Sequence, residues 1–111
     1  MKSLLRITHK EELTYCTLVF VCPGCLAGGP KNYDGLHALP VNAPYLSFPS
    51  WEWNGSLESP SLTPAILTTG YSRCHSFLRD GVFEFLPDSS HSLAGKKISI
   101  PDLPMWAENL K

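Results

Sequence analysis

The chain has 111 residues, enough for one compact domain and too few for a two-domain enzyme. Hydrophobic residues make up 43% of it, which is sufficient for an ordinary core. Nine Lys and Arg residues against ten Asp and Glu residues give a net charge of −1, so the chain lacks the general basic field that binds nucleic acid. We therefore expect a single domain over residues 1–111 that has no nucleic-acid partner.

The N-terminal segment becomes charged before any apolar run reaches the length of a signal peptide. The longest apolar run, residues 18–21, falls far short of the ~20 residues that a membrane-spanning helix needs. We therefore expect a cytoplasmic protein without membrane contacts. Because the cytoplasm is reducing, the four cysteines favour metal binding over disulfides.

The elements expected from the sequence are short, because ten prolines and eight glycines are spread along the chain. The run of β-branched and aromatic residues over 13–21 predicts a central strand. A polar, glycine-rich loop is expected after residue 25. Further strands are expected at 36–41, at 51–53 and from 60 to 69.

The clearest local signal is a β-hairpin. Two strand-like runs, 74–78 and 82–86, flank the loop Arg79-Asp80-Gly81. A turn over 87–95, a strand over 96–100 and a terminal helical turn at 105–110 complete the chain. The predicted fold class is mainly β: a small single-domain antiparallel sheet with a zinc-ribbon-like cysteine knuckle and little helix.

Cys22-Pro23-Gly24-Cys25 forms a C-x-x-C turn directly after the central strand. This spacing lets two thiolates converge on one tetrahedral ion, with zinc as the first choice and iron as the alternative. A redox dithiol would instead open a helix, and the Gly28-Gly29-Pro30 sequence downstream argues against a helix there. The motif therefore predicts a metal site.

The other ligands of this site must come from distant parts of the chain. Cys74 and His75 are neighbours on a predicted strand, so their side chains point to opposite faces and do not share one closed site. If Cys74 joins the C-x-x-C pair, the fourth ligand is His37 or His91. His37 is the simpler choice, because a C-x-x-C turn followed by a His-bearing strand is similar to one half of a zinc ribbon.

A second group of polar residues brackets the hairpin: His75 and Ser76 lie on its first strand, and Asp88 and His91 follow its second. A serine, a histidine base and an orienting carboxylate are the inventory of a serine hydrolase. Two other interpretations stay open. Asp88 and Ser90 can cap a turn that His91 closes through backbone hydrogen bonds. Alternatively, His75 and His91 can hold a metal ion whose bound water is the nucleophile.

Trp51 and Trp53 alternate ahead of the turn pair Asn54-Gly55. Exposed tryptophans suit protein contacts, so this segment is a candidate recognition surface. The alternative is that one tryptophan belongs to the core and the other covers the edge of the sheet.

Together these motifs resemble a family of small phage and bacterial proteins that are often labelled ammonia monooxygenase, over about residues 19–104. The resemblance rests on Cys22-Pro-Gly-Cys25 with His37, Trp51-x-Trp53-Asn-Gly, Pro60 and Pro64, Cys74-His75-Ser76-Phe77, and Asp88-x-Ser90-His91-x-Leu93-Ala94-Gly95. That label disagrees with this chain, which lacks the membrane segments such an enzyme needs. Relatives of the family accompany bacterial ubiquitin-like conjugation genes, which implies a deconjugating role similar to that of a serine peptidase.

The resemblance also implies roles for individual residues: metal ligands at Cys22, Cys25, Cys74 and His37, a nucleophile at Ser76, a base at His91, and an orienting group at Asp88 or His75. The chain departs from the family at two places. Relatives often carry a serine at the position of Ala65, and they have a shorter segment between the second cysteine and the histidine. If that serine is the nucleophile, this chain is inactive.

We therefore expect a zinc-stabilised β domain with a Ser/His hydrolytic site that cleaves an ester or peptide bond at the tail of a ubiquitin-like protein. The alternative is a non-catalytic zinc-binding adaptor, a phage or bacterial interaction module whose Trp51/Trp53 surface binds another protein.

Overall fold

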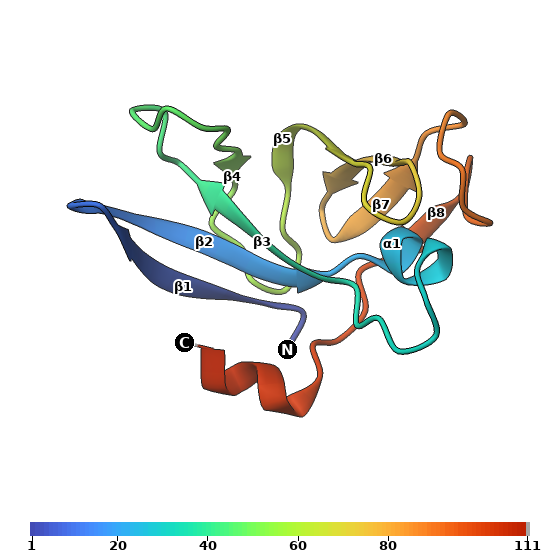
Figure 1. Cartoon of the computed structure of the whole chain (residues 1–111), viewed down its shortest axis with the longest axis horizontal. Coiled ribbons are helices and arrows are strands. Elements are labelled where there is room, and N and C mark those ends of the chain that lie inside the picture. Colours follow the sequence, from blue (N-terminus) through green and yellow to red (C-terminus); the bar gives the residue numbers. More distant parts are fainter. Residues whose placement is uncertain (111) are drawn as a thin grey trace.

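The computed structural model describes residues 1–110 and contains two antiparallel β-sheets (Figure 1). The three-stranded sheet has the order β1 (Ser3–Lys10), β2 (Leu13–Val21) and β3 (Leu36–Val41). The five-stranded sheet follows chain order: β4 (Glu52–Trp53), β5 (Leu62–Thr68), β6 (Cys74–Arg79), β7 (Val82–Phe85) and β8 (Lys97–Ser99). The mainly β fold class is confirmed, although the strands form two sheets.

The expected central strand is β2, and it is apolar along most of its length because both of its faces are buried. Leu18 and Phe20 face the core between the two sheets, where Phe20 contacts Phe83 of β7. The opposite face packs on the C-terminal 3₁₀ helix, Met105–Leu110, in a second cluster made of Leu4, Val19, Val21, Leu103 and Ala107. The sequence of β2 is therefore continuous in hydrophobicity instead of alternating.

The predicted hairpin is β6 and β7, and its turn is tighter than expected. Arg79 pairs with Val82, which leaves only Asp80 and Gly81 in the loop. Both residues have positive φ, 49° and 75°, as a two-residue hairpin turn of the type I′ class requires. This turn fixes the register that places Ser76 opposite Phe85.

Two elements differ from the sequence prediction. The prediction omits β1, an edge strand whose outer half is exposed and carries charged residues. The expectation of no helix after the C-x-x-C turn is wrong, because α1 spans Pro23–Gly28. Pro23 stands at the first position of the helix, where a missing N–H costs no hydrogen bond, and the chain leaves the helix at Gly29. No helix within residues 1–110 is long and apolar enough to cross a membrane.

Candidate metal centre and acid–base pair

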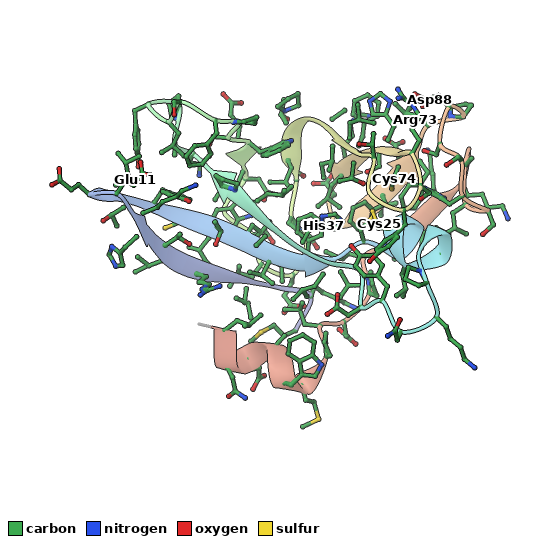
Figure 2. The ribbon with its side chains drawn as sticks, viewed as in Figure 1. Glu11, Cys25, His37, Arg73, Cys74 and Asp88 are labelled. Atoms are coloured by element: carbon green, nitrogen blue, oxygen red, sulfur yellow. The ribbon has the colours of Figure 1, made fainter. Side chains whose placement is uncertain are left out.

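Four side chains from three segments that are distant in the sequence lie together between the two sheets. Cys22 follows β2 and caps α1, Cys25 lies within α1, His37 belongs to β3, and Cys74 opens β6. Figure 2 shows Cys25, His37 and Cys74 gathered beside α1. The Sγ atoms of Cys22 and Cys74 are 3.7 Å apart, and Nε2 of His37 is 3.2 Å from Sγ of Cys25.

Local structure explains how Cys22, Cys25 and His37 converge. The N–H of Cys25 donates to Sγ of Cys22, so the first turn of α1 brings the two sulfurs to one side. The chain then returns through Gly35, whose positive φ of 67° permits a sharp turn and whose carbonyl accepts from the N–H of Cys22. His37 consequently pairs with Phe20 on β2 and stacks on its ring.

These residues have the chemistry and spacing of a metal centre. The ligand atoms of Cys22, Cys25 and His37 all lie within 4.8 Å of one another, close enough to hold an ion. The separation of the Cys22 and Cys74 sulfurs also fits, because two sulfurs bound tetrahedrally at about 2.3 Å lie about 3.8 Å apart. Three thiolates and an imidazole are soft and borderline ligands, which suit zinc or iron and not magnesium or calcium.

Without an ion, the three buried thiols share their protons unequally. Hydrogen bonds from Cys22, then from Cys74, lower the pKa of Cys25 well below its usual value. The bond to Cys25 is the main cause that raises the pKa of Cys22 to about 12, and the bond to Cys22 is the main cause that raises the pKa of Cys74. Cys25 is therefore the thiol of the cluster that ionises most readily, and an ion held by all three sulfurs would displace the protons of the other two.

A cavity of about 110 Å³ lies beside the cluster. Cys25 and His37 line it together with Thr68, Tyr33 and Tyr71, and the hydroxyl of Thr68 is 3.2 Å from Sγ of Cys25. Two of the candidate ligands therefore face a cavity that the Tyr33 and Tyr71 rings also line.

His75 and Asp88 form a second polar site, on the opposite face of β6 from Cys74. Asp88 accepts from Nδ1 of His75 at 3.1 Å and from Arg73, whose Nε and Nη2 lie 3.0 and 2.9 Å away. Figure 2 shows Arg73 and Asp88 side by side above the edge of the sheet, away from the cysteines. The hydrogen bond from His75 is the largest cause that lowers the pKa of Asp88, so this carboxylate stays ionised.

Ser76 and His91 are buried, and they do not join the His75–Asp88 pair. The Ser76 side chain is 1% exposed on the core face of β6, and its hydroxyl has no hydrogen-bond partner among the described residues. Nδ1 of His91 accepts from the N–H of Leu93, and its Nε2 is likewise without a partner. The structure therefore does not pair Ser76 with His91, and the orienting carboxylate that the sequence offered to His91 bonds to His75.

Other sequence interpretations also meet the geometry. His75 bonds to Asp88 on the outer face of β6, whereas His91 is buried against Phe85. These two histidines therefore do not converge on one ion. Trp51 and Trp53 are both half-buried and pack against the core.

One residue that the sequence did not single out is Ser89, whose hydroxyl accepts from the N–H of His75 and donates to its carbonyl. The Asp88-Ser89-Ser90 run is the signal that marks such side-chain to backbone bonding.

The fold and the site define a small β protein with a Cys/His cluster close enough to hold a metal ion. A family model described as "Bacterial ubiquitination-like system serine protease (BubE)" matches residues 2–86. The chain therefore belongs to the BubE family, whose description places it in a bacterial ubiquitination-like system. No curated protein and no solved structure matches the chain.

Proposed function

We propose that this protein is a metal-stabilised hydrolase that cleaves an ester bond at the tail of a ubiquitin-like protein, with His75 as its general base. The observation that carries the proposal is the 3.1 Å contact between Nδ1 of His75 and the carboxylate of Asp88. It supplies the base and the orienting group that family membership calls for.

The hydrogen-bond pattern sets the protonation of His75. An ionised carboxylate only accepts hydrogen bonds, so Asp88 keeps the proton of neutral His75 on Nδ1. The lone pair of Nε2 is then available to remove a proton from an attacking group. Ser89 holds the backbone of His75 through two hydrogen bonds, which fixes the position of the ring.

The attacking group in this proposal is water. Ser76 follows His75 in a strand and therefore points to the other face, into the core. Among the described residues, no serine hydroxyl is hydrogen-bonded to Nε2 of His75. General-base catalysis contributes about 10²–10⁴-fold, which favours reactive acyl bonds such as esters over peptide bonds as substrates.

The metal centre has a structural role in this proposal. Zinc held by Cys22, Cys25, His37 and Cys74 closes a tetrahedral site without an open position, as structural zinc does. Cys74 is the residue before His75, so the ion would anchor the start of the strand that presents the base. The ion thus stabilises the site without taking part in the reaction.

The test is turnover of a ubiquitin-like protein that carries a fluorogenic ester at its C-terminus. We expect the natural chain to release the fluorophore, His75→Ala to abolish release, and Ser76→Ala to retain it. A serine-directed fluorophosphonate should not label the protein. Labelling that disappears in Ser76→Ala would overturn the assignment of water and restore Ser76 as the nucleophile.

A second candidate function is a non-catalytic adaptor that binds the same kind of protein. It is favoured by Ala65, which stands where the resembling proteins often carry a serine, and by the lack of a hydroxyl bonded to Nε2 of His75 among the described residues. This candidate predicts capture of the ubiquitin-like protein without turnover. Replacing Trp51 and Trp53 by alanine should then abolish capture, with folding checked by circular dichroism.

A further inference from the structure

His91 is the most deeply buried histidine whose polar atoms are not all used. His91 is 7% exposed. Its ring packs edge-to-face on the ring of Phe85, with the two ring centroids 4.9 Å apart. The other side of the ring meets α1 so closely that a Cβ on Gly24 would lie 2.6 Å from Nε2. His91 is thus wedged between β7 and the C-x-x-C turn.

The hydrogen bonds of His91 identify its tautomer. The N–H of Leu93 donates to Nδ1 at 3.1 Å, so Nδ1 is the acceptor and Nε2 of the neutral ring carries the proton. Burial lowers the pKa of His91, which keeps the ring neutral. Nε2–H is therefore a buried donor without an acceptor, an arrangement that calls for an explanation.

The candidate acceptors for Nε2–H of His91 are the cysteine sulfurs of the metal centre. Gly24, whose missing Cβ would lie 2.6 Å from Nε2, stands between Cys22 and Cys25 in the turn. Gly24 is the residue before Cys25 on α1, so the His91 ring packs against the helix turn that carries this sulfur. A centre of three thiolates and one imidazole around a divalent ion keeps a net negative charge, and N–H groups aimed at its sulfurs stabilise it.

We propose that Nε2–H of His91 donates a hydrogen bond to the Cys25 thiolate when the ion is bound, and that His91 is a positioning residue of the metal centre. This inference rests on the metal centre of the proposed function, but not on its hydrolytic reaction. It gives His91 a role different from that of a catalytic base. It also explains why the C-x-x-C turn has a glycine at position 24, since any larger residue would separate His91 from the sulfurs.

The test compares two variants that keep different parts of the side chain. His91→Phe keeps a ring against Phe85 and removes the donor, whereas His91→Gln keeps an N–H near the position of Nε2. Loss of a partner that supports a metal ligand costs about 10–100-fold in affinity. We expect His91→Phe to bind Zn²⁺ that much more weakly in competition with a chelator, and His91→Gln to stay near the natural value.

The absorption spectrum of the Co²⁺-loaded protein separates a hydrogen bond to the thiolate from a purely structural role of His91. Removing a hydrogen bond from a thiolate raises the energy of its electrons, so the sulfur-to-cobalt charge-transfer band of the Co²⁺ protein should shift to lower energy in His91→Phe. The control is His9→Phe, because His9 is exposed on β1 and bonds to Thr14. A His91→Phe protein that binds Zn²⁺ with the natural affinity and spectrum would overturn the inference.

A measurement on the natural chain covers the case in which His91→Phe does not fold. In the protein loaded with ¹¹³Cd²⁺, the Nε2 proton of His91 should show a scalar coupling to the metal, transmitted through the sulfur. Absence of this coupling in a metal-loaded protein refutes the role of His91 and leaves the metal centre intact. A natural chain that binds neither Zn²⁺ nor Co²⁺ refutes the metal centre itself, and His91 with it.

Discussion

The Nδ1 atom of His75 lies 3.1 Å from the carboxylate of Asp88, on the face of β6 opposite to Cys74. One strand therefore carries a predicted metal ligand on its inner face and the proposed base on its outer face, at consecutive positions. Because the two groups are joined by a single peptide unit, an ion that fixes Cys74 also limits the motion of His75. The metal centre and the acid–base pair are thus coupled through the backbone of β6.

Asp88→Asn tests whether His75 depends on its carboxylate. Asparagine can donate to Nδ1 and so favour the wrong tautomer of His75, which removes the base at Nε2. We expect the rate of ester hydrolysis to fall by about 10²–10⁴-fold, the contribution of general-base catalysis. Because its contacts depress the pKa of Asp88, the stability that they add is fully present above the usual carboxyl value of 3.8 and is lost as the pH falls through the depressed pKa, and Asp88→Asn should lack this pH dependence of unfolding.

Glu84→Gln is the matched control for this change. Glu84 is also an acidic residue in surface ion pairs, with Arg79 and Lys97, but it has no bond to His75. Its replacement should leave the rate unchanged and change stability little, because exposed ion pairs contribute little. Equal loss of rate in the two variants would contradict the specific role of Asp88.

Two serines that lie close in space should respond oppositely to alanine. The buried hydroxyl of Ser76 has no partner, so Ser76→Ala removes an unsatisfied group and should stabilise the fold by about 1 kcal/mol. Ser89→Ala breaks two hydrogen bonds to the backbone of His75 and should destabilise the fold by about 1–3 kcal/mol. Urea unfolding of both variants measures these differences, and destabilisation by Ser76→Ala would indicate a partner for its hydroxyl.

Local sequence patterns predicted most of the strands because burial and turn chemistry agree in them. The β-branched run of β2 and the Asp80-Gly81 turn of the hairpin each have a local physical cause. The edge strand β1 was not predicted, because its exposed outer half does not alternate between apolar and polar residues. α1 was not predicted, because Gly29 and Pro30, which disfavour helix, follow closely after the C-x-x-C turn. Pro23, by contrast, favours the start of a helix.

The candidate site was less predictable than the fold, because it depends on which side chains meet across the hairpin. The residue types indicated a histidine base, a serine nucleophile and an aspartate, but they did not show which of these side chains pair with one another. Strand parity places His75 outward and Ser76 inward, and the turn after β7 brings Asp88 to the outer face, beside Arg73. Only the three-dimensional path of residues 86–91 decides that Asp88 reaches His75.

Removal of the proposed metal should weaken the whole fold, because the ion would join the end of β2 to α1, β3 and β6. An ion present at about 1,000 times its dissociation constant stabilises the native state by ~4.1 kcal/mol. We expect a chelator, or Cys25→Ser, to lower the free energy of unfolding by about this amount. Cys16→Ser is the control, since Cys16 is a half-buried free thiol outside the cluster. Elemental analysis of untagged protein should find about one zinc per chain, and a chelator without effect on unfolding would refute a structural ion.

Gly24→Ala tests the tight packing of α1 against the strands. An added Cβ would lie 2.5 Å from Phe85 and 2.6 Å from His91, both of which are buried. Such overpacking typically costs about 1–3 kcal/mol, so a clear fall in the midpoint of thermal unfolding is expected. Gly70→Ala is the control: nothing lies within 4 Å of its Cβ position, so its effect should be neutral or slightly stabilising. Equal effects of the two changes would mean that α1 is not packed as described.

Ala65→Ser tests whether the outer face of β6 is a serine hydrolase site that lacks only its nucleophile. Leu67 pairs with His75, and Ile66 is buried whereas Leu67 is exposed. Alternation along the strand therefore puts residue 65 on the outer face, diagonally next to His75 and within reach of its side chain. A serine there would meet the free Nε2 of an imidazole that Asp88 already orients. We expect the variant to become labelled by a fluorophosphonate and to cleave peptide as well as ester bonds. Ala65→Ser combined with His75→Ala should lose both properties, and an unlabelled, folded single variant would show that residue 65 does not reach the base.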